Sequence, residues 1–297
     1  MTRRDFIGGS VAMMGALVEE PALAAKGAES CRAAAPFRLG VAGYTFKARS
    51  VDDALAIMQR ADVHYLCVKK CHLPFEATDE EIAAFKAKCA SHGVTPYAIG
   101  PIYDSKAEDV RSRFEFAKRL GVKTVVGVPF EMIPGEDDKE KRRGSRSLLL
   151  EIEKLVREFN IRYAIHNHGP QIGELFPDVE YGWNLVKDLD SRIGFCIDVG
   201  WEYACGKDPA ETIRKYGERI YDAHIKNFEV GKPNGAATPL PRGKIDLARV
   251  FKAFADVGYG GVCSLEYEKD FDDNLLAVVE SIAYERGVCD AICGAGR

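Results

Sequence analysis

Short apolar segments alternate with longer amphipathic segments along most of the chain, and glycine, proline or a capping residue separates one segment from the next. Eight of the apolar segments have the length of strands and are rich in β-branched and aromatic residues. They cover residues 37–46, 65–72, 94–103, 124–129, 162–168, 193–200, 220–227 and 261–267. The pattern therefore predicts eight strands with helices between them.

The segments between the strands carry the start and stop signals of helices. A Ser, Thr or Asp side chain before an amphipathic run can accept a hydrogen bond from a backbone N–H of the first turn, and glycine suits the backbone that ends a helix. The predicted starts are Ser50 with Asp53, Thr78 with Glu81, Ser105 with Glu108, Asp208 before Pro209, and Asp246; the predicted ends are Gly93, Gly121, Gly217 and Gly258.

Strands that alternate with helices pair in parallel, and eight such units close into a (β/α)8 TIM barrel. We therefore predict a single α/β domain of this type over residues 36–293. A doubly wound open sheet is the alternative, and it is disfavoured because no glycine-rich phosphate-binding motif follows the first strand. A chain of 297 residues with 46% hydrophobic residues is large enough for one such core.

The first residues differ from the rest of the chain and resemble a twin-arginine export signal. Arg3 and Arg4 precede a short apolar run, and the small residues at 22–25 suit cleavage. Because the run is too short to span a bilayer, we expect residues 1–25 to direct export to the periplasm without leaving a permanent membrane span. A disordered N-terminal tail is the alternative.

Charge and cysteine content limit the classes of partner. The formal net charge is -4, whereas proteins that bind nucleic acid carry a basic surface, so a small polar substrate is the better expectation. The nine cysteines include no zinc-finger spacing. Cys67, Cys196 and Cys263 lie in apolar strand segments and are expected to be core residues.

Side chains that bind metals stand at the ends of four successive predicted strands. His166 and His168 are two residues apart and therefore share one side of a strand. The next three strands carry Asp198, then His224 with Lys226, then Glu266 with Glu268. In a TIM barrel the carboxyl ends of all strands meet at one face, where active sites lie.

Each of these residues has a structural alternative, such as a hydrogen-bonded histidine, an aspartate that caps a helix or a glutamate paired with lysine. Four together at one barrel end favour a metal site, because buried imidazoles and carboxylates need compensation. The mixed nitrogen and oxygen set of His166, Asp198, His224 and Glu266 suits one divalent ion, Mn²⁺, Co²⁺, Zn²⁺ or Fe²⁺, rather than Ca²⁺.

The motifs IHNHGP, DVG, HIKN, GKID and LEYEKD, taken in this order along the chain, resemble those of the xylose isomerase-like TIM-barrel superfamily of sugar phosphate isomerases and epimerases. Within it, the chain is most similar to exported members proposed to act on 3-keto-glycosides. The resemblance implies the same metal ligands. Three positions depart from the pattern: His166 replaces a glutamate, Trp201 a histidine and Asn227 an aspartate.

The resemblance implies chemistry that begins with proton removal next to a carbonyl. In the epimerases the glutamate at the position of His166 is one of two acid/base groups, so its replacement argues against two-base epimerisation. One base is enough for elimination. The first interpretation is therefore a lyase that eliminates the aglycone of 3-keto-glycosides, the second a sugar isomerase or epimerase, and the third a non-catalytic sugar-binding barrel.

Individual roles follow from these positions. Glu266 is the expected base as well as a ligand, His168 is the nearest unassigned imidazole, and His72 is placed to protonate the leaving group or hold a hydroxyl. The residues expected to bind sugar are Lys69, Trp201, Lys226 and Arg242. An abasic-site endonuclease is excluded, because the related enzymes of that class need a larger ligand set for three metals.

The export signal gives the first testable prediction. Replacing Arg3 and Arg4 by lysine should leave the protein inside the cell, whereas the wild type should appear in the periplasm with a mature N-terminus near Ala25 or Lys26. Cell fractionation with N-terminal sequencing measures both. An intact N-terminus in the cytoplasm of wild-type cells would refute the prediction.

Overall fold

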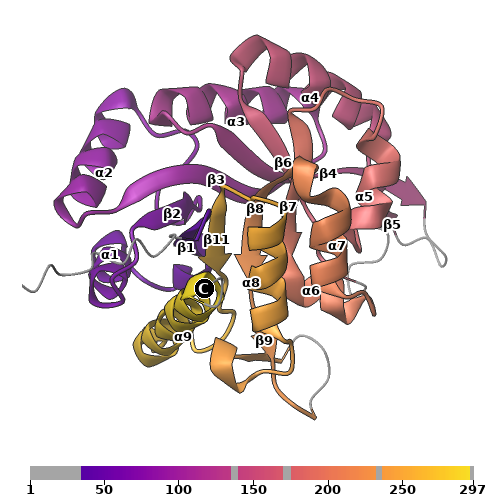
Figure 1. The fold of residues 1–297 in the computed structure, drawn as a ribbon. Helices are drawn as coiled ribbons and strands as arrows, with labels where there is room; N and C mark the ends of the chain where they lie inside the picture. The colour runs from indigo at the N-terminus through magenta and orange to yellow at the C-terminus, as the bar shows by residue number, and fades with distance from the viewer. Residues whose placement is uncertain (1–34, 135–139, 170–174, 232–235, 295–297) are drawn as a thin grey trace, which may run out of the picture. The chain divides into compact units, whose positions relative to one another are not determined.

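The computed structural model describes residues 35–134, 140–169, 175–231 and 236–294; the predicted export signal lies outside these ranges. Eight parallel strands form a closed barrel, in the order β3, β2, β1, β11, β8, β7, β6 and β4, and β4 pairs with β3 to complete the ring (Figure 1). The strands are β1 (Arg38–Ala42), β2 (Tyr65–Val68), β3 (Thr95–Asp104), β4 (Thr124–Pro134), β6 (Arg162–His166), β7 (Ile193–Asp198), β8 (Ile220–Ile225) and β11 (Val262–Leu265). The predicted (β/α)8 fold is confirmed.

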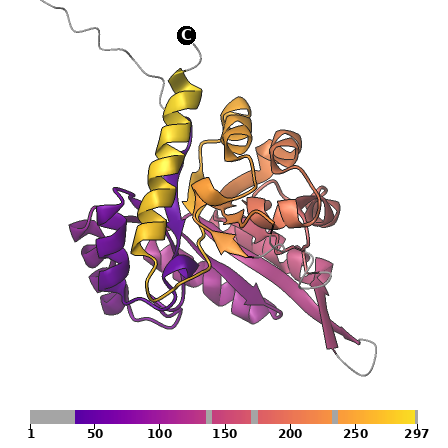
Figure 2. The same cartoon turned by 90° about the horizontal axis from the view of Figure 1, so that it is seen from below.

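Helices surround the strands (Figures 1 and 2). They are α1 (Val51–Arg60), α2 (Asp79–Ser91), α3 (Ala107–Leu120), α4 (Arg146–Phe159), α5 (Val179–Val186), α6 (Val199–Ala204), α7 (Pro209–Tyr216), α8 (Leu247–Asp256) and α9 (Leu275–Gly294). Figure 2 shows α9, in yellow, running beside β1 and the α1 region. No helix in the described ranges is long and apolar enough to cross a membrane.

The predicted helix caps are mostly confirmed. Ser50 accepts a hydrogen bond from the backbone N–H of Asp53, and Asp208 and Asp246 cap α7 and α8. The cap predicted at Ser105 is wrong, because α3 begins two residues later, after Lys106, with no side-chain cap. Two acidic residues in the first turn of α3 favour that helix terminus through the helix dipole.

Two strand pairings lie outside the predicted barrel pattern. β4 continues past the barrel and pairs antiparallel with β5 (Glu140–Gly144), and this ribbon projects from the barrel in Figure 2. The charged sequence EKRRG of β5 lacks the apolar pattern of a strand, which is why the sequence did not predict it. A second short pair joins β9 (Asn227–Phe228) to β10 (Ala237–Thr238).

The inside of the barrel contains an apolar layer below a polar one. Small buried residues from five strands form the apolar layer: Cys67, Ala98, Val126, Ala164 and Cys196. As predicted, Cys67, Cys196 and Cys263 are fully buried. Buried polar and charged side chains then gather at the carboxyl ends of β6, β7, β8 and β11, where a polar group must find a partner to offset the loss of water.

The caps allow a matched test of local stability. Thr78 and Glu81 form a reciprocal capping box at α2, so Thr78→Ala should lower the free energy of unfolding by about 1 kcal/mol. Lys106→Ala is the control, since Lys106 occupies the same position of α3 without a side-chain hydrogen bond. Denaturant unfolding of both variants measures the difference, and equal losses would contradict the assignment.

Candidate metal centre

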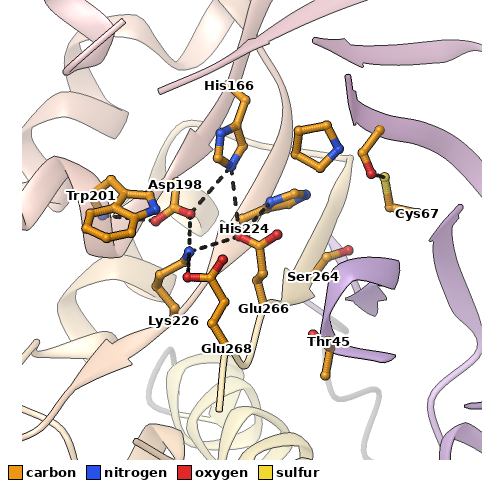
Figure 3. A network of polar contacts seen from close by, with 12 residues as sticks. Thr45, Cys67, His166, Asp198, Trp201, His224, Lys226, Ser264, Glu266 and Glu268 are labelled. Carbon is orange, nitrogen blue, oxygen red and sulfur yellow. Dashed lines mark hydrogen bonds and ion pairs between the residues drawn. The ribbon is translucent and has the colours of Figure 1, made fainter. Parts of the chain in front are cut away.

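Four buried side chains converge at the carboxyl face of the barrel, each from a different strand end. The strand register places Asp198 beside His224, and one ligand atom from each of His166, Asp198, His224 and Glu266 lies within 4.8 Å of the others. The Nε2 atom of His166 is 3.5 Å from Asp198 Oδ2 and 3.9 Å from Glu266 Oε2. His224 Nδ1 is 3.3 Å from Glu266 Oε2 (Figure 3).

The donor atoms of this cluster fit a divalent cation. Both ring nitrogens of His166 and the Nε2 atom of His224 are buried without a hydrogen-bond partner in the described part of the chain, and native proteins rarely leave such atoms unsatisfied. Burial, together with neighbouring His224, holds the pKa of His166 well below its usual range. The imidazole is then neutral, which is the form that binds metals.

Lys226, for which the sequence suggested a sugar-binding role, lies inside the same cluster. Its Nζ is 2.9 Å from Asp198 Oδ2, 2.9 Å from Glu266 Oε2 and 3.0 Å from Glu268 Oε2 (Figure 3). Burial lowers the pKa of Lys226, but these carboxylates outweigh burial and raise it well above its usual range. Three carboxylates thus face one ammonium, and this excess of acidic groups favours a divalent cation.

A cavity of about 210 Å³ opens above the cluster, and its walls contain several of the predicted site residues. The lining residues are Tyr44, Lys69, Pro101, Tyr103, His166, His168, Trp201, Glu266 and Glu268. The structure thus places Lys69, His168 and Trp201 in the lining of the cavity, and the roles expected for them stay predictions. Lys69 follows the end of β2, where the pairing with β3 has a register irregularity.

His168 and Trp201 form one wall of the cavity. Their rings stack with centroids 5.3 Å apart and planes 19° apart, and Tyr103 meets the His168 ring edge to face at 6.0 Å. Burial, with a smaller contribution from His166, lowers the pKa of His168 to about 4. This imidazole is therefore neutral near pH 7.

Two predicted site residues are not brought to the cavity. His72 is buried in the turn after β2, and its Nε2 lies 3.0 Å from the Phe46 carbonyl oxygen. Arg242 is on the surface, where its guanidinium donates two hydrogen bonds to Glu280 at 2.8 and 2.6 Å. Neither lines the cavity, so the structure gives both residues a structural partner in place of a substrate.

Four cavity residues received no individual role from the sequence, namely Tyr44, Pro101, Tyr103 and Glu268. Glu268 follows β11, and its side chain is 24% exposed; burial raises its pKa, while Lys226 opposes that shift. Its spacing of two from Glu266 was the available signal, since it places both on one side of the chain. For Tyr103, the available signal was its position near the end of β3.

A buried hydrogen-bond network fixes the position of Asp198. Asn167 accepts from the backbone N–H of Asp198 at 2.8 Å and donates to its carbonyl at 3.2 Å. Asn167 also donates to Glu202 at 3.4 Å, and burial raises the pKa of Glu202 to about 7. Asp198 Oδ1 accepts from the backbone N–H of Trp201, so one oxygen caps α6 while the other faces the cluster.

Comparison with known proteins assigns the family. A family profile described as a xylose isomerase-like TIM barrel matches residues 54–285. The chain belongs to this family. Among curated relatives it is 28% identical to a mannonate dehydratase of Brachyspira hyodysenteriae over 44% of this chain and 40% of the relative. It is 24% identical to an inosose isomerase of Bacillus velezensis over 65% of this chain and 74% of the relative.

Solved structures show the same fold. A D-tagatose 3-epimerase-like protein superposes with a TM-score of 0.71 at 19% identity, covering 88% of this chain and 100% of that one. The IOLI protein, solved with a zinc atom, superposes with a TM-score of 0.67 at 20% identity, covering 87% and 99%. The chain spans about 40% of the mannonate dehydratase. These solved structures share the barrel fold of this chain.

The cluster predicts a metal site that can be tested by removing one ligand at a time. Loss of a group that only supports a ligand costs about 10- to 100-fold in metal affinity, so His224→Ala and Asp198→Ala should each cost at least about 100-fold. Glu131→Ala, which removes a carboxylate paired with Arg143 on the ribbon, is the control. Elemental analysis and metal-dependent melting check the result; unchanged metal content in both ligand variants would disprove the site.

Proposed function

We propose that the protein is a divalent-metal-dependent lyase that removes the aglycone from 3-keto-glycosides by taking a proton next to the ketone. The observation that carries the proposal is that the cavity's two carboxylates, Glu266 and Glu268, both come from the segment that follows β11. Proton removal at one face of a carbon is sufficient for elimination. Relatives named as inosose and mannonate dehydratases support elimination as a reaction of this family.

The residues that would hold the metal are His166, Asp198, His224 and Glu266. A bound divalent cation supplies Lewis acidity, which stabilises negative charge that develops on a carbonyl oxygen by several kcal/mol. The zinc atom in the related IOLI protein and the unpartnered ring nitrogens of this cluster support metal dependence. The mixed nitrogen and oxygen donor set suits Mn²⁺, Co²⁺, Zn²⁺ and Fe²⁺ alike.

Glu268 is better placed than Glu266 to take the proton. Glu266 Oε2 already faces Lys226 at 2.9 Å and His224 at 3.3 Å. Within the described residues Glu268 has one ion-pair partner, Lys226, and its partly exposed side chain borders the cavity. We therefore assign the general base to Glu268 and the ligand role to Glu266, which revises the dual role expected from the sequence.

The source of the carboxylates distinguishes elimination from epimerisation. An epimerase must return the proton to the other face, which normally requires a second acid/base group. Among the described lining residues, no carboxylate comes from an element other than the segment after β11; the other lining residues include His166, His168 and Trp201. An isomerase or epimerase is the second candidate, because the inosose isomerase relative covers 65% of the chain and His168 would then be the second group.

We also propose that the enzyme works in the periplasm, after export directed by residues 1–25. The twin arginine and the short apolar run support this location. The net charge of the chain is -4, so the chain has no excess of basic residues. A small, polar and uncharged substrate fits this charge.

The assignment of the base predicts different effects for two neighbouring glutamates. Glu268→Gln should lower kcat on a 3-keto-glucoside by about 10²- to 10⁴-fold with the metal retained, because a neutral amide cannot accept the proton. Glu266→Gln should lower both kcat and metal affinity. Glu280→Gln, at the surface pair with Arg242, is the control for removal of a carboxylate.

Product analysis by NMR in deuterated water separates the two candidate functions. Elimination gives an unsaturated keto sugar and a free aglycone, whereas epimerisation gives a ketose with deuterium at the inverted carbon. If wild-type enzyme interconverts free ketoses and leaves keto-glycosides unchanged, the lyase proposal is wrong and the epimerase replaces it.

A further inference from the structure

A second cavity adjoins the metal cavity. Its volume is about 350 Å³, and three residues, Lys69, Pro101 and Tyr103, line both cavities. A substrate with two parts can therefore place one part in each cavity, with the bond between the parts close to the shared residues. The two parts of a glycoside are its sugar and its aglycone.

The second cavity combines two aromatic residues, Phe75 and Tyr103, with charged side chains such as Arg113. Phe75 is half-buried in its wall and packs edge to face on Phe116 at 5.5 Å, and the Arg113 guanidinium lies over the Phe75 ring at 4.4 Å. Tyr103 is 37% exposed, which is unusual for a large aromatic side chain at an otherwise buried strand end. Aromatic walls of this kind favour planar aromatic groups through offset or edge-to-face contacts.

Lys69 lines both cavities, and its ammonium has N–H donors that are available to a ligand. Its Nζ donates one hydrogen bond to the Pro101 carbonyl at 2.6 Å and lies 5.2 Å from the centroid of the Tyr44 ring. An ammonium has three donors. In the described ranges, no carboxylate lies within ion-pair distance of Lys69, unlike Lys226, which has three such partners.

We propose that the metal cavity holds the keto sugar, that the Phe75 cavity holds an aromatic aglycone, and that the Lys69 ammonium protonates the departing oxygen between them. This inference rests on the lyase function proposed above. Lys69 is thereby assigned as a catalytic acid, a more specific role than sugar binding. The Phe75 cavity is assigned as the aglycone subsite.

The proposed step balances without a further reactant. The base removes the proton from carbon 2, and the electron pair of that C–H bond forms the double bond between carbons 1 and 2. The bond from carbon 1 to the aglycone oxygen breaks, and its electron pair takes a proton from Lys69. The products are an unsaturated keto sugar and a phenol. Because burial lowers the pKa of Lys69, the ammonium is a stronger acid than an exposed lysine.

Leaving groups of different acidity test the role of Lys69. We expect Lys69→Ala to lower kcat on methyl 3-keto-β-glucoside by about 10²- to 10⁴-fold, because methoxide leaves poorly without a proton. The loss on the 4-nitrophenyl analogue should be less than about 10-fold, since nitrophenolate leaves unprotonated. Lys69→Arg, which retains the charge but not an acid of useful strength, should behave like Lys69→Ala. Equal losses on both substrates would overturn the assignment.

The aglycone subsite is tested by Phe75→Ala. This variant should raise KM for phenyl 3-keto-β-glucoside by roughly 10-fold and leave KM for the methyl compound within about 2-fold. Leu276→Ala, on an 80% exposed side chain of α9, is the control for loss of a surface apolar group. The same change in KM for both substrates would overturn the subsite.

A direct binding measurement separates failure of this inference from failure of the lyase function. Phenyl β-glucoside, which lacks the ketone, is titrated into wild type and Phe75→Ala and followed by NMR. Binding that Phe75→Ala weakens supports the subsite even if no keto-glycoside is cleaved, in which case the lyase function alone fails. Binding that is absent, or is unchanged in Phe75→Ala, overturns the subsite while cleavage of keto-glycosides still stands.

Discussion

The contact on which the site depends is the buried ammonium of Lys226 between the carboxylates of Asp198 and Glu266, at 2.9 Å from each. An isolated ionised group in a protein interior costs several kcal/mol, and the cost is offset only by good geometry and enough opposite charge. Here the carboxylates outnumber the ammonium. This excess of carboxylates, beside the buried ring nitrogens of His166 and His224, is what makes this end of the barrel suited to a divalent cation.

The fold creates this arrangement because neighbouring parallel strands end at one face and side chains alternate along each strand. Asp198 and His224 are partners in the register of β7 and β8, so their proximity follows from backbone pairing. Asn167, on the opposite side of its strand from His166 and His168, bonds the backbone of Asp198 instead. The same alternation that supplies the ligands thus also supplies the group that holds one of them in place.

Sequence patterns could predict the eight strands and the convergence of His166, Asp198, His224 and Glu266, because both follow from period and position at strand ends. They suggested sugar binding for Lys226 and not its ion pairs, since a lysine at a strand end is usually solvated and only the three-dimensional convergence of carboxylates explains its burial. His72 was misleading for a related reason: it lies in a turn after β2, where strand parity no longer decides direction. The β4–β5 ribbon was missed because its second strand, β5, consists mostly of charged residues. The cap predicted at Ser105 was wrong because a serine two residues before a helix has the same local pattern as one that caps it.

The central claim is that Lys226 and a divalent cation act together on the same carboxylates. Titration of metal-free wild type and of Lys226→Met with Mn²⁺, followed by calorimetry and by the electron paramagnetic resonance signal of free Mn²⁺, tests it most directly. The expected result is saturable binding of one ion per chain in the wild type. Saturable binding in Lys226→Met with none in the wild type would contradict the claim, because the ammonium would then take the place of the metal.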